Sequence, residues 1–188
     1  MKNIALFASG AGSNVLNIAN HFKNKPEVAL SLVVTNNPKA GVIDKCQQLG
    51  LPLVYTSKEA LKQGDFLEKL LRGHSIDLIV LAGFLLKIPD SLVQAYPNKI
   101  INIHPALLPD YGGKGMYGMH VHRAVKENNE KESGISIHYV NEHYDQGALI
   151  FQAKTALTPT DSAADIAAKV QALEAIHYPA VLEKLLYD

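Results

Sequence analysis

The sequence is poor in cysteine and has no long hydrophobic run. Cys46 is the single cysteine among 188 residues, which excludes an internal disulfide bond and fits a protein of a reducing compartment. No apolar stretch approaches the roughly 18 residues that a membrane-spanning helix needs. The apolar run at residues 1–7 is too short for a secretory signal peptide, and we interpret it as a buried strand. We therefore expect a cytoplasmic protein.

An excess of charge of one sign is also missing. The 18 lysines and arginines balance 18 aspartates and glutamates. This balance argues against the basic surface that is typical of nucleic-acid binders, so a strongly anionic ligand would need a local site. With 47% hydrophobic and 19% charged residues, the composition is that of an ordinary globular protein. The length suits one core, and we expect a single domain over residues 1–188.

Strand-like and helix-like runs alternate in the first part of the chain. We expect strands over 4–8, 28–34, 53–55, 76–82 and 99–104, and helices over 14–23, 41–49, 57–73 and 88–95, the last with Pro89 in its first turn. The strand over 76–82 is almost continuously apolar, which is typical of parallel strands that are covered on both faces. This alternation predicts an α/β fold with a doubly wound, mostly parallel sheet.

The pattern changes after residue 104. Residues 107–118 are rich in glycine and proline, and we expect a helix over 120–128, strands over 134–140 and 148–154, and a helix over 162–186. Asp161 or Ser162 could cap the last helix, and Pro179 is expected to bend or interrupt it. The sequence thus predicts an antiparallel C-terminal part followed by a long C-terminal helix.

A glycine-containing segment, Ser9–Asn14, joins the first expected strand to the first helix. In a parallel sheet this position lies at the edge where ligands bind, and a helix N-terminus favours an anion. It is no dinucleotide fingerprint, because Val15 stands at the third glycine position, and no Walker A lysine follows. The motif alone leaves two possibilities open: a phosphate site, or a tight turn in which Ser13 or Asn14 caps the helix.

Two polar residues, Asn102 and His104, stand at the end of an expected strand. Residues two apart in a strand share a face, so both side chains project at the ligand edge while Ile103 points the other way. Histidine is the usual proton shuttle near neutral pH, and an amide beside it can stabilise an oxyanion. The pair is therefore a candidate for acid–base catalysis.

An acidic residue, Asp145, lies in the polar turn between the last two expected strands. It could orient His104, but strand-end histidines and turn aspartates are more often turn formers or satisfied polar groups. His138 carries the same ambiguity. We expect His120 and His122 at a loop or helix surface, and without a third ligand they do not predict a metal site.

Four motifs in order resemble those of the folate-dependent formyltransferase family, and in particular its phosphoribosylglycinamide formyltransferases. They are Ser-Gly-Ala-Gly-Ser-Asn at 9–14, Val-Leu-Ala-Gly-Phe at 80–84, Asn-Ile-His-Pro-Ala-Leu-Leu-Pro at 102–109 and Asp-Gln-Gly at 145–147. The resemblance covers almost the whole chain, and it implies a Rossmann-like formyltransferase fold.

The resemblance implies a role for each matched residue. Asn102 would polarise the formyl carbonyl, His104 would shuttle protons and help stabilise the oxyanion, and Asp145 would hold and tune His104. The residues implied to bind the ribonucleotide are Gly12, Ser13, Asn14, Gln171 and Glu174. Those implied to line the folate pocket are Leu85, Leu86, Lys87, Ile88, Asn102, His138 and Asn141.

The reaction implied by the resemblance is formyl transfer in purine biosynthesis. The formyl group of 10-formyltetrahydrofolate, the co-substrate, would pass to the amine of glycinamide ribonucleotide by direct attack, with no metal and no covalent enzyme intermediate. The implied partners are small molecules, with neither nucleic acid nor membrane, and the implied assembly is a monomer or a homodimer.

Two departures from the family pattern stand out. Leu85-Leu86 replaces a common Met-Arg pair, with Lys87 one place later, which puts the details of the folate contact in question. The glycine-rich loop at 111–120 is longer than the common version and is either a flexible cover over the site or a tolerated surface insertion.

Three other functions would account for part of this pattern. A formyltetrahydrofolate deformylase would use water in place of the amine and usually carries an N-terminal regulatory domain, whereas we expect this chain to start directly at its first strand. Methionyl-tRNA formyltransferase would need a basic surface and a further C-terminal RNA-binding domain. A non-catalytic phosphate-binding module would keep the glycine segment but would have no use for Asn102, His104 and Asp145 together.

Overall fold

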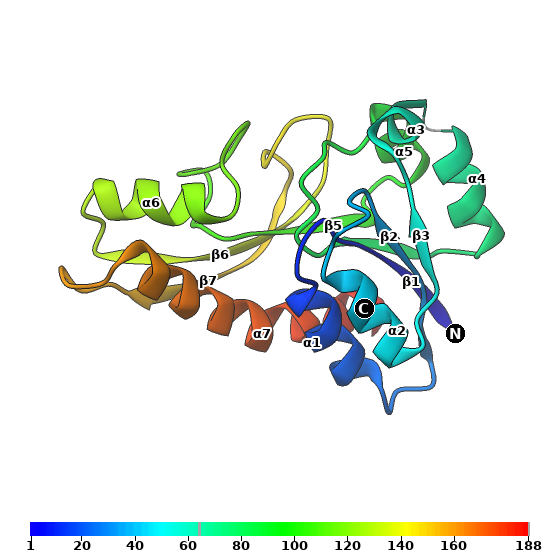
Figure 1. The fold of residues 1–188 in the computed structure, drawn as a ribbon, viewed down its shortest axis with the longest axis horizontal. Helices are drawn as coiled ribbons and strands as arrows, with labels where there is room; N and C mark the ends of the chain where they lie inside the picture. Colours follow the sequence, from blue (N-terminus) through cyan, green and yellow to red (C-terminus); the bar gives the residue numbers. More distant parts are fainter. Residues whose placement is uncertain (64, 188) are drawn as a thin grey trace. The chain divides into compact units, whose positions relative to one another are not determined.

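The computed structural model describes residues 1–63 and 65–187. The chain forms two compact units, Met1–Asn102 and Ile103–Asp188, which are drawn from blue to green and from green to red in Figure 1. The expectation of a single domain over 1–188 stays a prediction. Within the described residues, none of the helices combines the length and apolar character that crossing a membrane requires.

The first unit is built on a parallel sheet with the strand order β3-β2-β1-β4-β5. All four neighbouring pairs run parallel. The strands are β1 (Lys2–Phe7), β2 (Val28–Thr35), β3 (Leu53–Tyr55), β4 (Leu78–Leu81) and β5 (Ile100–His104). The order reverses between β1 and β4, and ligands of doubly wound sheets bind at the carboxyl ends of the strands at this switch point.

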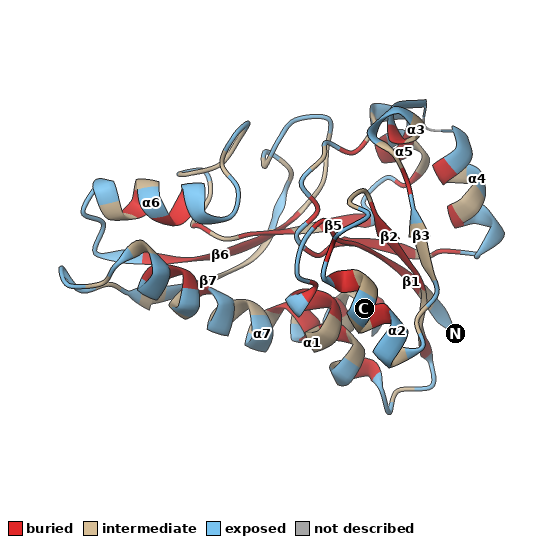
Figure 2. Cartoon of the chain, in the orientation of Figure 1, coloured by how far each residue is buried: buried red, intermediate tan, exposed pale blue. Residues whose placement is uncertain are grey.

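Burial in the first unit follows its apolar runs. The segment from Ile4 to Phe7 is fully buried, as are Ile79 and Val80 in β4, and Figure 2 shows these strands in red. The accompanying helices are α1 (Ser13–Phe22), α2 (Val42–Leu49), α3 (Lys58–Gln63), α4 (Asp65–Gly73) and α5 (Asp90–Ala95). Since continuous apolar strands need cover on both faces, the pattern accounts for the parallel arrangement.

The observed helix boundaries agree with the predicted ones at some positions and correct them at others. As expected, α2 ends at Gly50, whose φ of 65° is a left-handed conformation that glycine adopts without steric cost. Pro89 precedes α5 rather than lying in its first turn, which corrects the expected start at residue 88. The helix expected over 57–73 corresponds to α3 and α4, and position 64 lies outside the described residues.

The second unit contains the antiparallel pair β6 (Glu132–Tyr139) and β7 (Leu149–Ala156). It also holds α6 (Met119–Glu127) and the long helix α7 (Ala163–Tyr187), which packs against both strands. The predicted fold class is therefore confirmed: a mostly parallel α/β architecture with an antiparallel C-terminal part and a long C-terminal helix.

A reciprocal cap starts α7. The Ser162 hydroxyl accepts the backbone N–H of Asp165 at 3.2 Å, and the Asp165 carboxylate accepts the backbone N–H of Ser162 at 2.8 Å. This arrangement satisfies two backbone donors at the helix start, so the prediction that Ser162 caps the helix is confirmed. The helix continues past the buried Pro179 to Tyr187, so Pro179 does not interrupt it.

The turn between β6 and β7 holds Asp145 and depends on Gly147. The Asn141 amide donates to the Gln146 carbonyl at 3.2 Å, and Asp145 has a φ of 55°, in the left-handed region. A Cβ atom on Gly147 would overlap the backbone carbonyl of Tyr139. The two arms of the turn can therefore approach each other this closely only because residue 147 has no side chain.

Substitution of Gly147 by alanine is expected to destabilise the protein by about 1–3 kcal/mol, because backbone atoms must move to admit the methyl group. Urea denaturation followed by circular dichroism measures this loss. The matched control is Gly73→Ala, where an added Cβ meets no atom within 4 Å. The control should not lose stability, because alanine is at least as favourable as glycine in a helix. Equal stabilities of the two variants would contradict the account.

Candidate active site

The two strand-end residues predicted as a catalytic pair both lie in β5. His104 is buried and Asn102 is partly exposed, while Ile103, on the opposite face, is buried as expected. Alternation along a strand places residues 102 and 104 on one face. Pro105 follows directly and prevents β5 from continuing as a regular strand.

His104 uses both of its ring nitrogens. Nε2 lies 2.8 Å from the backbone carbonyl oxygen of Tyr111, and Nδ1 lies 3.5 Å from Oδ2 of Asp145. A carbonyl oxygen can only accept, so Nε2 carries a hydrogen. Asp145, which spacing alone left as a probable turn residue, therefore reaches His104 in the folded chain.

Asp145 is the centre of a small polar cluster. The Gly113 backbone N–H donates to Oδ2 at 2.9 Å, and Nε2 of His138 lies 3.6 Å from Oδ1. The Asp145 side chain is 12% exposed, and the His104 and His138 side chains are 4% and 2% exposed. The structure thus brings together three predicted site residues, His104, His138 and Asp145, in one nearly dry cluster.

The surroundings lower the pKa of His104 and the pKa of Asp145. Burial lowers the pKa of His104, and the Asp145 charge and the Tyr111 carbonyl offset this only in part. Burial alone would raise the pKa of Asp145, but the hydrogen bond from His138, the charge on His104 and the Gly113 N–H outweigh it. The two shifts favour the ionised form of the Asp145 carboxyl group and the neutral form of the His104 ring.

The backbone that follows His104 is held by a buried hydroxyl. Ser136 Oγ, fully buried in β6, donates to the Ala106 carbonyl at 2.7 Å and accepts the Leu108 N–H at 2.9 Å. The Gln152 amide nitrogen donates to the same hydroxyl at 2.8 Å and to the Leu108 carbonyl at 2.9 Å. This network ties the segment after β5 to the hairpin that carries His138.

Ser136 and Gln152 were missed from the sequence, and Tyr111 and Gly113 were named only as part of the glycine-rich loop at 111–120. Tyr111 and Gly113 contribute only backbone atoms, which side-chain patterns do not reveal. The sequence did contain an indication of Ser136, because it stands two residues before His138 and so shares its strand face. A polar pair on one face of an otherwise apolar strand is the pattern that could have identified it.

His122 corrects a prediction. It was expected at a surface, but it is 4% exposed in α6, and its Nδ1 has no hydrogen-bond partner in the part of the chain that the structure describes. Burial lowers its pKa, with a smaller contribution from the charge of His104. His120 is exposed as expected. Among the described residues, no three histidine, cysteine, aspartate or glutamate side chains are placed to hold a metal ion.

In the first unit, the glycine segment lies at the switch point after β1. Gly12 has a φ of 74°, and a Cβ there would lie 2.7 Å from the Val42 side chain, so only glycine fits. Gly12 is the N-cap residue of α1, and no side-chain cap hydrogen bond is found there among the described residues, which does not favour the alternative of a cap by Ser13 or Asn14. Ser9 Oγ accepts the Leu85 N–H at 2.9 Å, which joins this segment to the one that follows β4.

The remaining predicted contact residues have varied surroundings. Leu85 is 50% exposed, Lys87 is exposed and pairs with Asp90 at 2.7 Å, and Ile88 is buried. Leu86, Asn141 and Glu174 are partly exposed and Gln171 is exposed. Asn141 is occupied in holding its own turn, since its side-chain oxygen accepts the His143 N–H at 2.9 Å.

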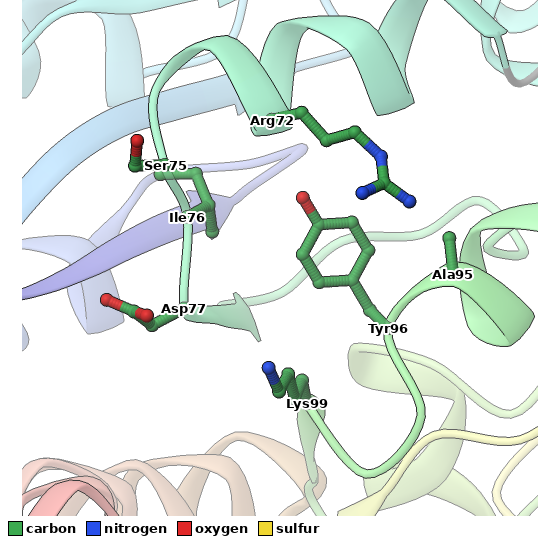
Figure 3. Close-up of a pocket in the computed structure, with 7 residues that line it drawn as sticks. All are labelled: Arg72, Ser75, Ile76, Asp77, Ala95, Tyr96 and Lys99. Atoms are coloured by element: carbon green, nitrogen blue, oxygen red, sulfur yellow. The ribbon is translucent and has the colours of Figure 1, made fainter.

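A separate pocket of about 410 Å³ lies at the opposite edge of the first unit (Figure 3). Its lining residues are Arg72, Ser75, Ile76, Asp77, Ala95, Tyr96 and Lys99. Asp77 and Lys99 directly precede β4 and β5, so the pocket faces the amino ends of the strands. Ligands of this fold class bind at the carboxyl ends, and we therefore do not assign the pocket to the candidate active site.

Comparison with known proteins identifies the class. The model of the formyl transferase family matches residues 2–182, and the chain belongs to this family. Among curated relatives, phosphoribosylglycinamide formyltransferase of Bacillus subtilis is 37% identical over 99% of this chain and 95% of its own length. The chloroplastic phosphoribosylglycinamide formyltransferase of Arabidopsis thaliana is 38% identical over 90% of this chain. This chain spans 60% of that relative's length.

Solved structures agree with the sequence relatives. The crystal structure of phosphoribosylglycinamide formyltransferase from Anaplasma phagocytophilum superposes with a TM-score of 0.91 at 30% identity, over 100% of this chain and 87% of that one. The resemblance inferred from the four motifs is thereby confirmed.

Replacement of Ser136 by alanine is expected to lower the unfolding free energy by about 1–3 kcal/mol, because the Leu108 N–H loses its buried acceptor. Chemical denaturation provides the measurement. Ser133→Ala on the same strand is the control, since the Ser133 hydroxyl is buried and, among described residues, has no partner. If the Ser133 variant loses as much stability as the Ser136 variant, the network does not have the role assigned to it.

Proposed function

We propose that the protein transfers the formyl group of 10-formyltetrahydrofolate to the amine of 5'-phosphoribosylglycinamide, a step of de novo purine (IMP) biosynthesis. Membership of the formyl transferase family and the names of the relatives support this activity. The observation that carries the proposal is the buried contact between His104 Nδ1 and Asp145 Oδ2 at 3.5 Å.

The proposed reaction begins with the neutral amine nitrogen of the ribonucleotide. It attacks the formyl carbon, a C–N bond forms, and negative charge develops on the formyl oxygen. Asn102 and the N–H of His104 stabilise this oxyanion. The proton leaves the attacking nitrogen, the bond between the formyl carbon and the folate nitrogen breaks, and the folate nitrogen receives a proton. His104 Nε2 can give its hydrogen to the departing folate nitrogen and take up the proton of the attacking nitrogen, so that one proton passes from one nitrogen to the other.

The contact between His104 and the Tyr111 carbonyl must break before His104 can act on the substrate. The Nε2 hydrogen of His104 now points to the Tyr111 carbonyl, and the same hydrogen is the one available to an oxyanion. We propose that residues 111–120 form a cover that exchanges this contact for the substrate. The left-handed backbone at Gly113 and Gly115, with φ of 95° and 92°, supports a role for glycine in shaping this loop.

The binding roles that we propose follow the family resemblance. The ribonucleotide phosphate lies at Gly12, Ser13 and Asn14, where a helix N-terminus favours an anion. Gln171 and Glu174 contact the rest of the ribonucleotide. The folate pocket is lined by Leu85, Leu86, Lys87, Ile88, Asn102, His138 and Asn141.

The proposed setting is that of a small-molecule enzyme of the cytoplasm that acts as one domain, as a monomer or a homodimer. Balanced charge supports partners other than nucleic acids and membranes, and a single cysteine supports a reducing compartment.

We expect His104→Ala and Asp145→Asn each to reduce formyl transfer by about 10²–10⁴-fold, because each removes part of one acid–base unit. The measurement is the absorbance change of the folate on deformylation, followed with and without glycinamide ribonucleotide. His74→Ala serves as the control, since this exposed histidine directly follows α4, beside the residues at the amino ends of the strands, and should leave the rate unchanged.

The same assay separates the rival functions. Folate turnover that does not require the ribonucleotide would favour a deformylase. Phosphate-ligand binding without any turnover would favour a non-catalytic module. A folded His104→Ala protein with full activity would exclude the acid–base role of this histidine.

A further inference from the structure

Ser9 lies just beyond the end of β1, and its backbone and side chain contact three different segments. Its N–H donates to the Gly83 carbonyl at 3.0 Å, and its own carbonyl accepts the Asn37 side-chain amide at 3.2 Å. Its hydroxyl donates to Oδ1 of Asn36 at 2.6 Å and accepts the Leu85 N–H at 2.9 Å. This buried residue therefore joins the segments that follow β1, β2 and β4.

The segments that follow β1 and β4 form the two sides of the ligand crevice in a fold of this class, because the strand order reverses between these strands. The backbone bonds that continue the sheet here include those from Ala8 to Val34 and from Ala82 to Phe7. Beyond this point the chains leave the sheet. The bonds of Ser9 therefore connect the two sides of the crevice where the sheet itself no longer does so.

The direction of the Ser9 hydroxyl is set by Asn36. An amide oxygen only accepts, so the single hydroxyl hydrogen points to Asn36 and the lone pairs of the oxygen are left for the Leu85 N–H. Removal of the hydroxyl would leave this N–H without its acceptor in the described part of the chain. The backbone of Leu85 would then lose its tie to the segment that follows β1.

We propose that Ser9 is a positioning residue of the reaction: its hydroxyl holds the folate-binding residues 85–88 in a fixed place relative to the phosphate-binding residues 12–14. This inference rests on the proposed function, in which each of the two segments holds one substrate. The link then sets where the formyl group lies relative to the attacking amine, and small displacements of reacting groups reduce rates strongly. Ser9 acts through Leu85 and not on the reacting atoms.

The test is a kinetic comparison of Ser9→Ala with the native protein. We expect KM for 10-formyltetrahydrofolate to rise and kcat to fall, each by about tenfold, because residues 85–88 are no longer held in place. KM for glycinamide ribonucleotide should change by less than about twofold, since the residues that hold the phosphate are retained. Steady-state rates measured over a range of both substrate concentrations give the three constants.

Matched variants separate positioning from a purely structural role. Ser31→Ala removes a similar bond, from a serine hydroxyl in β2 to Oδ1 of Asn3 in β1 at 3.0 Å, and should leave the three constants unchanged. Ser9→Thr and Ser9→Val both add a methyl group, but only threonine keeps the hydroxyl. Threonine should therefore retain a folate KM close to the native one, and valine should behave like alanine.

Amide hydrogen exchange at Leu85 tests the link without any substrate. Exchange should be about tenfold faster in Ser9→Ala than in the native protein, and unchanged in Ser31→Ala. Equal exchange in native and Ser9→Ala protein would overturn the link itself. A native protein without formyl transfer would instead refute the proposed function, so the two failures are distinguishable.

Three kinetic results would overturn the positioning role: an unchanged folate KM in folded Ser9→Ala protein, equal effects of Ser9→Thr and Ser9→Val, or equal changes in Ser31→Ala. If no variant at position 9 folds, Asn36→Ala replaces it, because Asn36 is partly exposed and orients the hydroxyl. An unchanged folate KM in Asn36→Ala would then overturn the proposal.

Discussion

The candidate site depends on the contacts that the Asp145 carboxylate makes with its neighbours. It is almost buried, and it contacts His104, His138 and the Gly113 N–H at distances between 2.9 and 3.6 Å. A buried charge is tolerated only when it is paired and hydrogen-bonded, so the surrounding groups must be held in place. The Ser136 network and the close turn at Gly147 supply this support from the same hairpin.

Much of the fold could be predicted from the sequence because its signals are local. Continuous apolar runs such as Ile4–Phe7 indicated buried parallel strands, and Gly50 and Ser162 marked helix ends by well-understood backbone chemistry. The pairing of Asn102 with His104 on one strand face was likewise a matter of spacing. The helix that contains Pro179 is not interrupted there, whereas a bend at Pro179 stays a prediction.

The rest of the site could not be predicted because it depends on contacts between distant residues. Spacing left Asp145 as a turn residue, and only the folded hairpin brings it within 3.5 Å of His104. Tyr111 and Gly113 act through backbone atoms, which any residue possesses. His122 was expected at a loop or helix surface, and the packing of α6 buries it. Tertiary packing decides such positions.

The central claim is that His104 and Asp145 act as one unit. A double-mutant cycle tests it: kcat/KM for formyl transfer is measured for the native protein, His104→Ala, Asp145→Asn and the double variant. If the residues act together, the double variant loses little more than the more damaged single variant, since removing either partner already disables the unit. Losses that multiply in the double variant would show independent roles and would contradict the account.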